Sequence, residues 1–527
     1  MFWLLLGLLF IILYLYNYKK LNYWTNKGVK QKKTFLLYEL YKMFFMKKSF
    51  VELLQDTYNE FPDSRYSGSF QLYSPLLVLK DSELIKQITV KDFEHFTDHI
   101  NLVPEGIEPL WTSNLFALKG DKWRDMRATL SPAFTSSKMR AMFALMSDCA
   151  QEVAKYFENH QGESKSIELR DLFTRYTNDV IATCAFGVQC NSIKQRNNEF
   201  YLMGNLATDF TGIWKITKLL IYMMLPKLSK ILGFSFFEKS VSIFFRRIIK
   251  DTIKMREENN VTRPDMIHLL MDARKGQLNY DENIAIQDAG FAAVEESEIG
   301  KTVKKVKDVI TDDDITAQAL IFFFAGFDSV ATLMVLMAYE LAVHPDIQER
   351  LQNEIDIVLE ENDGKITYDA INKMKYLDMV TSETLRKWPP NIVINRVCVK
   401  PYTIPAVLPD EIPVTLQVGD AISVPVYGIH RDPKNYPNPE KFDPERFNDE
   451  NKVNIEAYTY LPFGSGPRNC IGSRFALIET KVVYIHLLAK FNIVVTEKSE
   501  IPVKLSKTGF NFNSKNGFWF GLKLRDS

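Results

Sequence analysis

The sequence predicts a mainly α-helical protein with small β-sheets, an α+β fold in one large domain. Helical periodicity dominates the chain, for example in the amphipathic stretches 144–160 and 171–189. β-like runs are few and short, at 70–80, 401–426 and 517–525. No repeat, low-complexity block or Gly/Ser-rich linker divides the 527 residues, and 46% of them are apolar, enough for a large core.

The composition argues against several classes of function. Lysine plus arginine number 65 and aspartate plus glutamate also number 65, whereas a nucleic-acid-binding protein carries a basic excess. We therefore expect no nucleic acid partner. The five cysteines are irregularly spaced and include no CxxC pair, so neither a disulfide framework nor a zinc cluster is expected. This pattern is typical of a reducing compartment.

The N-terminus predicts a membrane anchor over residues 1–18. Residues 2–16 are an unbroken apolar run, slightly shorter than the roughly 17–25 residues of a usual membrane span. Lysines follow this run instead of preceding it, and no small-residue cleavage site is present, which favours an uncleaved signal anchor over a cleaved signal peptide. We expect a basic linker over 19–45 and a large cytosolic domain over 46–527.

Residues 311–343 predict one long buried helix. The segment is apolar on all sides and would run roughly 50 Å, so a second membrane span is the competing interpretation. Thr311 before three aspartates is typical of a helix start, and His344 with Pro345 predicts its end. A polar step, Gly-Phe-Asp-Ser, lies in the middle and would be costly in lipid, which favours a core helix.

The stretch "FGSGPRNCIG", residues 463–472, places a cysteine at the mouth of the predicted helix 473–491. Gly464 and Gly466 permit backbone conformations that other residues avoid and leave room for a flat group. These glycines do not fit a phosphate-binding pattern. Backbone N–H groups at a helix start favour a thiolate, which acts as a nucleophile or as a metal ligand. No histidine lies in an evident pairing motif, which favours a metal ligand over a nucleophile.

Several motifs together resemble the cytochrome P450 superfamily. Phe463, Gly466, Arg468, Cys470 and Gly472 match the family's haem-binding signature. "WRDMR", "AGFDSVAT", "ETLR" and "YPNPEKFDPERF" match further motifs in the expected order, and the resemblance covers nearly the whole chain. Finer matches such as "NDVIATCAFGVQCNS" resemble the microsomal branch that holds insect families 6 and 9 and vertebrate family 3, with family 9 the nearest.

The resemblance implies a haem b cofactor, iron protoporphyrin IX, with Cys470 as the iron ligand. It implies that further residues contact the haem, the arginines because their planar forks bind propionate carboxylates bidentately: Phe463, Arg468, Trp123, Arg127 and Arg396. It also implies a buried structural network of Glu383, Arg386 and Arg446. Glu383 and Arg386 lie three residues apart, one helical turn, and can pair on one face.

On the long helix, the resemblance implies that Asp328 and Ser329 are catalytic and guide protons to bound dioxygen. Ser329 departs from the family's threonine, since serine keeps the hydroxyl and loses the methyl that restricts χ1. Thr332 offers a second hydroxyl one turn later. The alternative is that Asp328 only caps a local kink.

Apolar residues around these motifs are candidate substrate contacts: Leu110, Trp111, Phe116, Phe323, Phe327, Ile392, Ile394 and Phe510. Residues 219–237 are apolar and predict either a buried helix pair or a loop that dips into the bilayer and admits lipophilic substrates.

The resemblance implies a membrane-bound monooxygenase that inserts one oxygen atom of O2 into lipophilic substrates, xenobiotics such as plant toxins or insecticides. Electrons would come from NADPH through NADPH–cytochrome P450 reductase, with cytochrome b5 as a second candidate donor. The expected location is the endoplasmic reticulum membrane. A hormone or fatty-acid hydroxylase, a haem–thiolate isomerase or dehydratase that needs no O2, and a non-catalytic haem protein remain alternatives. A basic docking face for the reductase is expected at Lys122, Arg124, Lys434 and Arg474.

The family usually carries a proline-rich hinge after its anchor, and this chain has no proline before Pro62.

Overall fold

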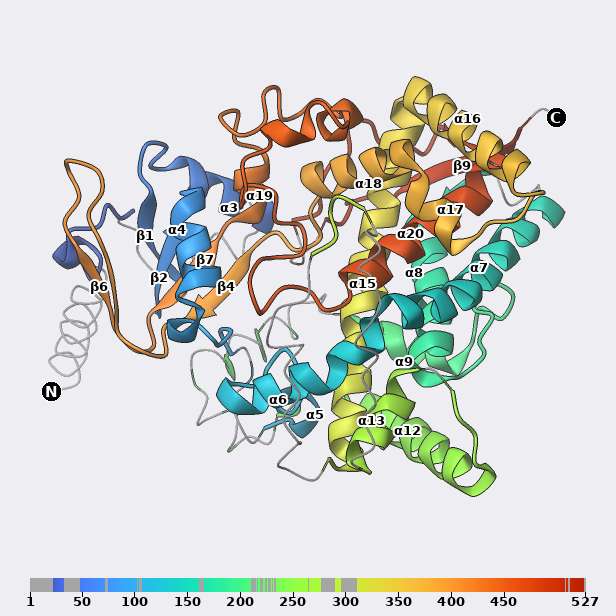
Figure 1. The fold of residues 1–527 in the computed structure, drawn as a ribbon, viewed down its shortest axis with the longest axis horizontal. Coiled ribbons are helices and arrows are strands. Elements are labelled where there is room, and N and C mark those ends of the chain that lie inside the picture. Colours follow the sequence, from blue (N-terminus) through green and yellow to red (C-terminus); the bar gives the residue numbers. More distant parts are fainter. Residues whose placement is uncertain are drawn as a thin grey trace, which may run out of the picture.

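A computed structural model of the 527-residue chain describes residues 22–32, 48–71, 74–101, 103, 107–160, 165–209, 215, 217–218, 221–222, 225, 229, 231, 234–263, 265–275, 290–294, 310–507, 509 and 512–525. The predicted anchor over 1–18, most of the predicted linker and Phe510 lie outside the described residues. The expectation of a mainly helical fold with small sheets is confirmed over the described part (Figure 1).

The helices are α3 (Phe50–Asn59), α4 (Ser82–Lys86), α5 (Pro109–Thr112), α6 (Gly120–Leu130), α7 (Ser136–Asn159), α8 (Leu169–Ile181), α9 (Glu199–Thr208), α12 (Lys239–Asn259), α13 (Met266–Arg274), α15 (Asp312–Val343), α16 (Pro345–Glu361), α17 (Tyr368–Lys373), α18 (Lys375–Lys387), α19 (Val426–His430) and α20 (Ser473–Leu488). The strands are β1 (Tyr66–Gln71), β2 (Ser74–Leu79), β3 (Ile167–Glu168), β4 (Ile394–Val397), β5 (Tyr402–Ile404), β6 (Val414–Leu416), β7 (Ala421–Val424), β8 (Phe491–Val495) and β9 (Trp519–Leu524).

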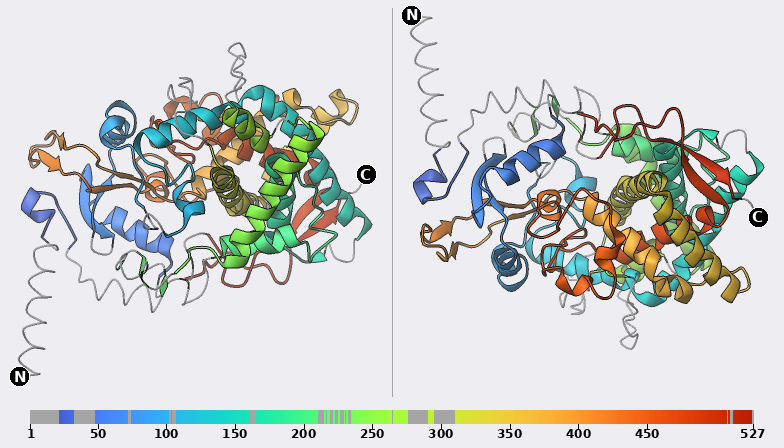
Figure 2. Two further views of the ribbon diagram at one scale, coloured as in Figure 1. Left: turned by 90° about the horizontal axis from the view of Figure 1, so that it is seen from below. Right: turned by 90° about the horizontal axis from the view of Figure 1, so that it is seen from above.

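Helix α15 runs through the centre of the protein, and Figure 2 shows it end-on with other helices around it. It begins as the sequence predicts, because the Thr311 hydroxyl accepts a hydrogen bond from the Asp314 N–H and the Asp314 carboxylate accepts one from the Thr311 N–H. Among the described helices, only α15 is long and apolar enough to span a membrane. It packs against α8, α5, α12 and α20, and 61% of its most apolar stretch is buried, so the predicted core helix is confirmed.

Three small sheets flank the helices. One has the strand order β1-β2-β7-β4, another β3-β9-β8, and β5 pairs with β6. Strand β2 pairs in parallel with β7, although more than 300 residues separate them in the sequence. The three β-like runs each contain strands, whereas β3, β4 and β8 were not predicted. Strand β4 matters for the site because it places Arg396 opposite Ile422 of β7.

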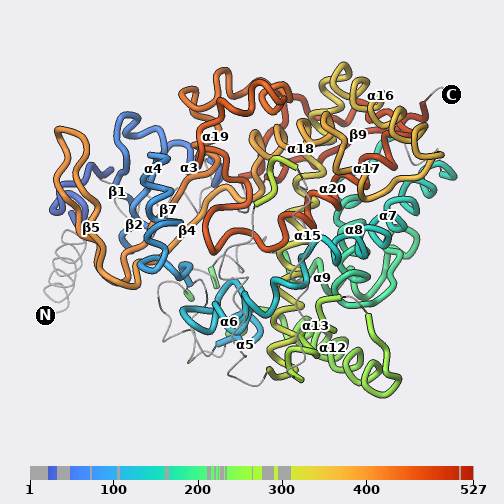
Figure 3. Tube along the Cα trace, viewed as in Figure 1, coloured from blue at the N-terminus to red at the C-terminus, as the bar shows by residue number. Residues whose placement is uncertain are grey.

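Residues 22–32, inside the predicted linker, pack on the sheet that contains β1 (Figure 3). Trp24 is fully buried and its Nε1 donates to the Ser69 carbonyl at 3.0 Å. A Cβ on Gly68 would lie 2.5 Å from the Trp24 side chain, so the glycine makes room for this indole. The Tyr23 hydroxyl donates to Asp420, which also pairs with Lys27. Side-chain contacts thus hold this part of the chain without a proline.

Candidate active site

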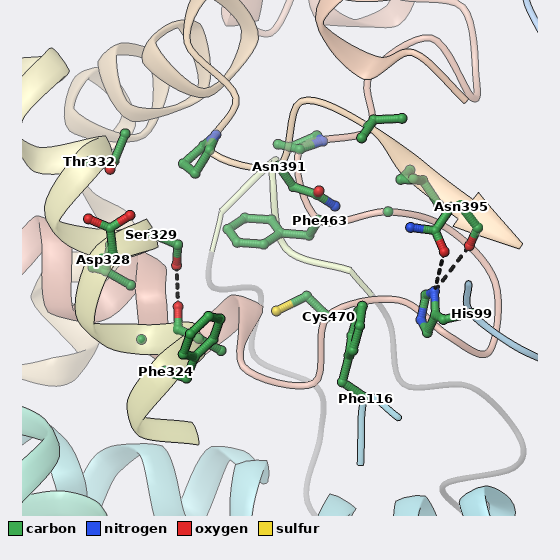
Figure 4. Close-up of a pocket in the computed structure, with 18 of the residues that line it drawn as sticks. His99, Phe116, Phe324, Asp328, Ser329, Thr332, Asn391, Asn395, Phe463 and Cys470 are labelled. Atoms are coloured by element: carbon green, nitrogen blue, oxygen red, sulfur yellow. Dashed lines mark hydrogen bonds between the residues drawn. The ribbon is translucent and has the colours of Figure 1, made fainter. Parts of the chain in front are cut away.

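A cavity of about 1420 Å³ lies between α15 and the loop that carries Cys470. Figure 4 shows the Cys470 sulfur directed towards α15, with Phe463 and Phe116 near it. Most of the wall is apolar, and its aromatic residues include Trp111, Phe116, Phe134, Phe236, Phe322, Phe324 and Phe327.

The Cys470 loop is positioned by backbone contacts. Gly464 and Gly466 have φ of +78° and +70°, in the left-handed region that favours glycine. A Cβ on Gly466 would lie 1.8 Å from the Thr89 carbonyl oxygen, so no larger residue fits there. The Cys470 N–H donates to the Phe463 carbonyl at 2.9 Å, which closes the loop on itself.

Arg127 of α6 braces the same loop. Its two terminal nitrogens donate to the Asn469 carbonyl and to Asn469 Oδ1, each at 2.8 Å. The backbone next to Cys470 is therefore tied to a helix more than 300 residues earlier in the chain, which orients the sulfur into the cavity.

The Cys470 side chain is exposed to the open cavity, yet the protein around it desolvates the thiol and raises its pKa above the ordinary value, because desolvation disfavours the thiolate. A hydrogen bond from the Gly472 N–H and the charge of Arg127 act in the opposite direction and are weaker. A bound metal cation would supply the missing stabilisation, since coordination deprotonates a thiol.

Three buried arginines line the cavity close to one another, Arg127, Arg396 and Arg468. Burial lowers the pKa of Arg468 to about 8, with the charge of Arg396 as the next cause, and lowers the pKa of Arg396 to about 10. Among the described residues, Arg396 Nε has no hydrogen-bond partner, and the carboxylate nearest to Arg468 is Asp98 at 4.0 Å. Such a cluster of buried cations calls for an anion in the cavity.

Arg468 is held in place by its surroundings. Its guanidinium lies 4.0 Å from the centre of the Trp123 ring, a cation–π contact, and donates to four backbone carbonyls, those of Thr97, Leu115, Phe116 and Leu118.

These features fit an iron porphyrin with two carboxylates. The Cys470 sulfur faces the cavity and would serve as a ligand to the iron, the arginines would bind the carboxylates, and the glycine-rich loop would allow close approach. Within the described part of the chain, no three His, Cys, Asp or Glu side chains form a cluster that could hold a metal ion.

Sequence reasoning missed His99, which also lines this part of the cavity. Its Nδ1 lies 3.0 Å from the Asn395 carbonyl, which requires the proton on Nδ1, and its ring stacks on Phe116 at 4.5 Å. Burial, together with the charges of Arg396 and Arg468, lowers the pKa of His99 well below its ordinary value. A lone histidine outside any motif carries no sequence signal for such a position.

On the α15 side, Asp328 is held by Arg170 of α8, a residue that sequence reasoning also missed. Arg170 Nη1 lies 2.9 Å from Asp328 Oδ1 and 2.8 Å from Thr332 Oγ1, and Nη2 donates to the Phe512 carbonyl at 2.8 Å. One arginine thus connects the acid, a second hydroxyl and the C-terminal segment. No local pattern reveals a pair that is 158 residues apart.

The Ser329 hydroxyl donates to the Ala325 carbonyl of its own helix (Figure 4). Ala325 and Gly326 both line the cavity. A Cβ on Gly326 would lie 2.9 Å from Ile181 Cδ1 of α8, so this glycine also permits the close packing of α8 on α15.

Four of the candidate substrate contacts line the cavity: Trp111, Phe116, Phe327 and Ile394. Leu110, Phe323 and Ile392 do not line it and are packed in the core instead. Phe323 shows the reason, because it lies on the face of α15 turned to α9, where its ring meets Phe200 and covers Gly204. From the described part of 219–237, Phe236 reaches the cavity and packs on Trp111 at 4.6 Å.

Glu383, Arg386 and Arg446 lie together behind the site. Arg386 Nε and Nη2 donate to the two oxygens of Glu383 at 2.7 and 2.8 Å, with both side chains fully buried. Arg446 Nε lies 3.5 Å from Glu383 Oε1, and the Asp443 N–H donates to the same oxygen at 2.9 Å. The network joins α18 to the segment that leads to the cysteine loop.

A family model described as Cytochrome P450 matches residues 37–519. The chain is 50% identical over 494 residues to "Cytochrome P450 9e2" of Blattella germanica, with 91% of this chain and 89% of that protein covered. It is 41% identical over 516 residues to "Probable cytochrome P450 9f2" of Drosophila melanogaster (96% and 95% covered) and 36% identical over 508 residues to "Cytochrome P450 6k1" of Blattella germanica (95% and 93% covered).

Proposed function

Because this chain belongs to the cytochrome P450 family and is a monooxygenase of that family, we propose that it is a membrane-bound enzyme that oxidises lipophilic xenobiotics such as plant toxins or insecticides. One observation carries the proposal: a large apolar cavity has Cys470 on one side and Asp328 with Ser329 on the other. An apolar wall favours lipophilic ligands, and the opposed polar groups define where oxygen is transferred.

Cys470, three arginines and Trp123 are proposed to hold the cofactor, haem b. When bound, the haem supplies dioxygen binding and cleavage of the O–O bond, which a cysteine ligand favours. Cys470 provides the sulfur ligand. Arg127, Arg396 and Arg468 would bind the propionates, and Trp123, which stacks on Arg468, would keep its fork oriented. Phe463 packs at the cavity wall beside the sulfur.

Residues of α15 and α8 are proposed to deliver protons. Asp328 takes up protons and passes them towards the Ser329 hydroxyl, which faces the cavity. Arg170 orients the Asp328 carboxylate and brings the Thr332 hydroxyl within reach of the same cluster. Ala325 lines the cavity, and its small side chain leaves space for a ligand at this point of the helix.

The aromatic wall supports a broad range of lipophilic substrates. Trp111, Phe116, Phe236 and Phe327 present flat apolar surfaces, which bind varied ligands mainly by area. A hormone or a fatty acid of similar polarity would meet the same wall, so a hydroxylase of endogenous lipids is the second candidate.

Electrons are proposed to come from NADPH through NADPH–cytochrome P450 reductase, with cytochrome b5 as a second donor. The apolar N-terminal run and the lysines after it support an endoplasmic reticulum anchor with the catalytic domain in the cytosol. Of the basic residues expected in the docking face, Arg124 already pairs with Glu94 and Asp121, and Lys434 lies 3.5 Å from Asp63. Lys122 and Arg474 are the stronger candidates for contact with an acidic partner.

A haem–thiolate isomerase or dehydratase is the rival enzyme. Such an enzyme needs no proton delivery to dioxygen, so the cluster of Asp328, Thr332 and Arg170 beside the cavity favours the monooxygenase.

The decisive variant is Cys470→Ala in the haem-loaded protein. We expect complete loss of the thiolate-shifted band in the reduced carbon monoxide spectrum, with Cys190→Ala as the control that keeps it. The wild-type protein with reductase should consume NADPH and O2 and yield oxygenated products from lipophilic compounds. A band that persists in Cys470→Ala would refute the ligand assignment, and product formation without O2 would favour the isomerase.

A further inference from the structure

His430, the last residue of α19, is fully buried between α18 and the segment that leads to Cys470. Each of its two ring nitrogens has a backbone partner. Nδ1 lies 3.1 Å from the Arg386 carbonyl oxygen of α18, and Nε2 lies 2.8 Å from the Leu461 nitrogen. The imidazole therefore bridges α18 and the start of the cysteine loop.

These two contacts fix where the ring carries its proton. A carbonyl oxygen only accepts a hydrogen bond, so Nδ1 is protonated, and a backbone N–H only donates, so Nε2 is unprotonated. Burial lowers the pKa of His430 to about 3, with the charge of Arg386 as the next cause, so the ring is uncharged at neutral pH. Nε2 is thus available as an acceptor for the Leu461 N–H.

The neighbours of His430 hold its ring in one orientation. Tyr460 stacks on it with the ring centres 5.5 Å apart and the planes 19° apart, and Tyr436 meets it edge-on at 6.2 Å. The His430 carbonyl accepts a hydrogen bond from Arg386 Nη1 at 3.0 Å. The arginine that pairs with Glu383 therefore also holds the backbone of the histidine.

Leu461 lies at the start of the cysteine loop. Its N–H is the last backbone donor before Phe463, because Pro462 has none. Its carbonyl accepts from the Gly464 N–H at 3.1 Å, and the Phe463 carbonyl accepts from the Cys470 N–H at 2.9 Å. Leu461 is buried, so its N–H would be left unsatisfied if the imidazole acceptor were removed, and a buried donor without a partner costs free energy.

We propose that His430 is a positioning residue for Cys470, because its Nε2 acceptor fixes the start of the cysteine loop and so keeps the sulfur directed into the cavity. The proposal rests on haem ligation by Cys470. Without this acceptor, the buried Leu461 N–H must find another partner, which moves the start of the loop and disturbs the contact between Phe463 and Cys470 that closes it. Part of the protein then loses the thiolate ligand while the chain stays folded.

The test compares His430→Gln with His430→Asn in the haem-loaded full chain by the reduced carbon monoxide spectrum. Glutamine places its amide oxygen near the position of Nε2 and accepts from Leu461, whereas the shorter asparagine reaches only the position of Nδ1 and donates to Arg386. Each variant keeps one of the two hydrogen bonds and loses the ring, so the pair is matched.

His430→Gln should keep most of the thiolate-shifted band. In His430→Asn, the ratio of this band to the unshifted band of haem without a thiolate ligand should fall by about fivefold or more. A purely structural role would lower the unfolding temperature of both variants and leave the band ratio of the haem-bound protein equal in the two. Equal ratios would therefore overturn the proposal, whichever band dominates.

His160→Asn is the control. The His160 contacts are of the same kind, since Nδ1 lies 2.8 Å from the Tyr156 carbonyl oxygen and the ring stacks on Tyr156 at 4.4 Å. His160 is exposed at the end of α7, away from the cysteine loop, so this variant should keep the wild-type spectrum.

Hydrogen exchange gives a second measurement, which decides even if His430→Asn does not fold. In haem-loaded His430→Gln, the Leu461 amide should exchange as slowly as in the wild type. Fast exchange together with a retained thiolate-shifted band would show that this hydrogen bond does not position the sulfur, and the proposal would fail.

The wild-type spectrum separates this inference from the proposed function. Absence of the thiolate-shifted band in the wild type would refute Cys470 ligation and the role of His430 together. A normal band in both the wild type and His430→Asn would refute the positioning role and leave the monooxygenase assignment intact.

Discussion

The two sides of the cavity are built in different ways. The cysteine loop is fixed by backbone, through glycines with positive φ, a carbonyl that excludes any Cβ on Gly466, and a brace from Arg127 to Asn469. The α15 side depends on side chains, through the ion pair of Asp328 with Arg170 and the Ser329 hydroxyl bonded to its own helix. A position fixed by backbone contacts accepts few other residues. A position fixed by side-chain contacts accepts residues that keep part of the interaction. The departure from the family pattern, serine for threonine, falls on the tolerant side.

Substitutions on the two sides should therefore have different effects. Changes behind the cysteine loop should prevent folding or cofactor binding, while changes on α15 should leave the spectrum intact and alter how efficiently electrons yield product.

The largest effect is expected for Glu383→Gln, behind the cysteine loop. The buried Arg386 loses its charge partner, and breaking a buried pair costs about 3–5 kcal/mol in free energy of unfolding. Chemical unfolding measures the loss of free energy of unfolding, and the fraction of haem retained measures the effect on cofactor binding. Asp369→Asn breaks the exposed pair with Arg140 and should stay close to wild type. If the two variants had the same free energy of unfolding, the Glu383 network would not stabilise the cysteine-loop side of the cavity.

A smaller effect is expected for Arg170→Gln on the other side. Asp328 loses its ion pair, so proton delivery becomes less well oriented, and product formed per NADPH consumed should fall by about 10- to 100-fold. Peroxide release should rise, and the thiolate-shifted band should remain. Arg196→Gln, which alters an exposed pair with Asp171, is the control. Loss of the thiolate-shifted band in Arg170→Gln would show that α15 substitutions also disturb cofactor binding, against the proposed difference between the two sides.

The smallest effect is expected for Ser329→Thr. Threonine keeps the hydroxyl and restricts χ1, so product per NADPH should rise by no more than about threefold. Ser329→Val, which removes the hydroxyl and keeps the branched shape, should lower it. The same assay measures both variants. A large loss in Ser329→Thr would mean that α15 is as intolerant as the cysteine loop.

The features that the sequence predicts well are those that depend on residues close together in the chain. The Thr311 cap and the His344–Pro345 stop define α15 within a residue. Substrate contacts were less predictable, since Phe323 and Phe327 share a helix and are four residues apart, yet only Phe327 lines the cavity. An aromatic residue in an all-apolar helix carries no periodic signal for the face it occupies.

By itself, the sequence determined the family motifs, the limits of α15, the left-handed glycines beside Cys470 and the spacing that pairs Glu383 with Arg386. Each of these depends on backbone preferences or on neighbours within one helical turn. Only the tertiary structure decided that Arg170 meets Asp328, that His99 joins the buried arginines and that His430 links α18 to the cysteine loop. Those contacts join residues far apart in the chain, and the packing of the whole core selects them.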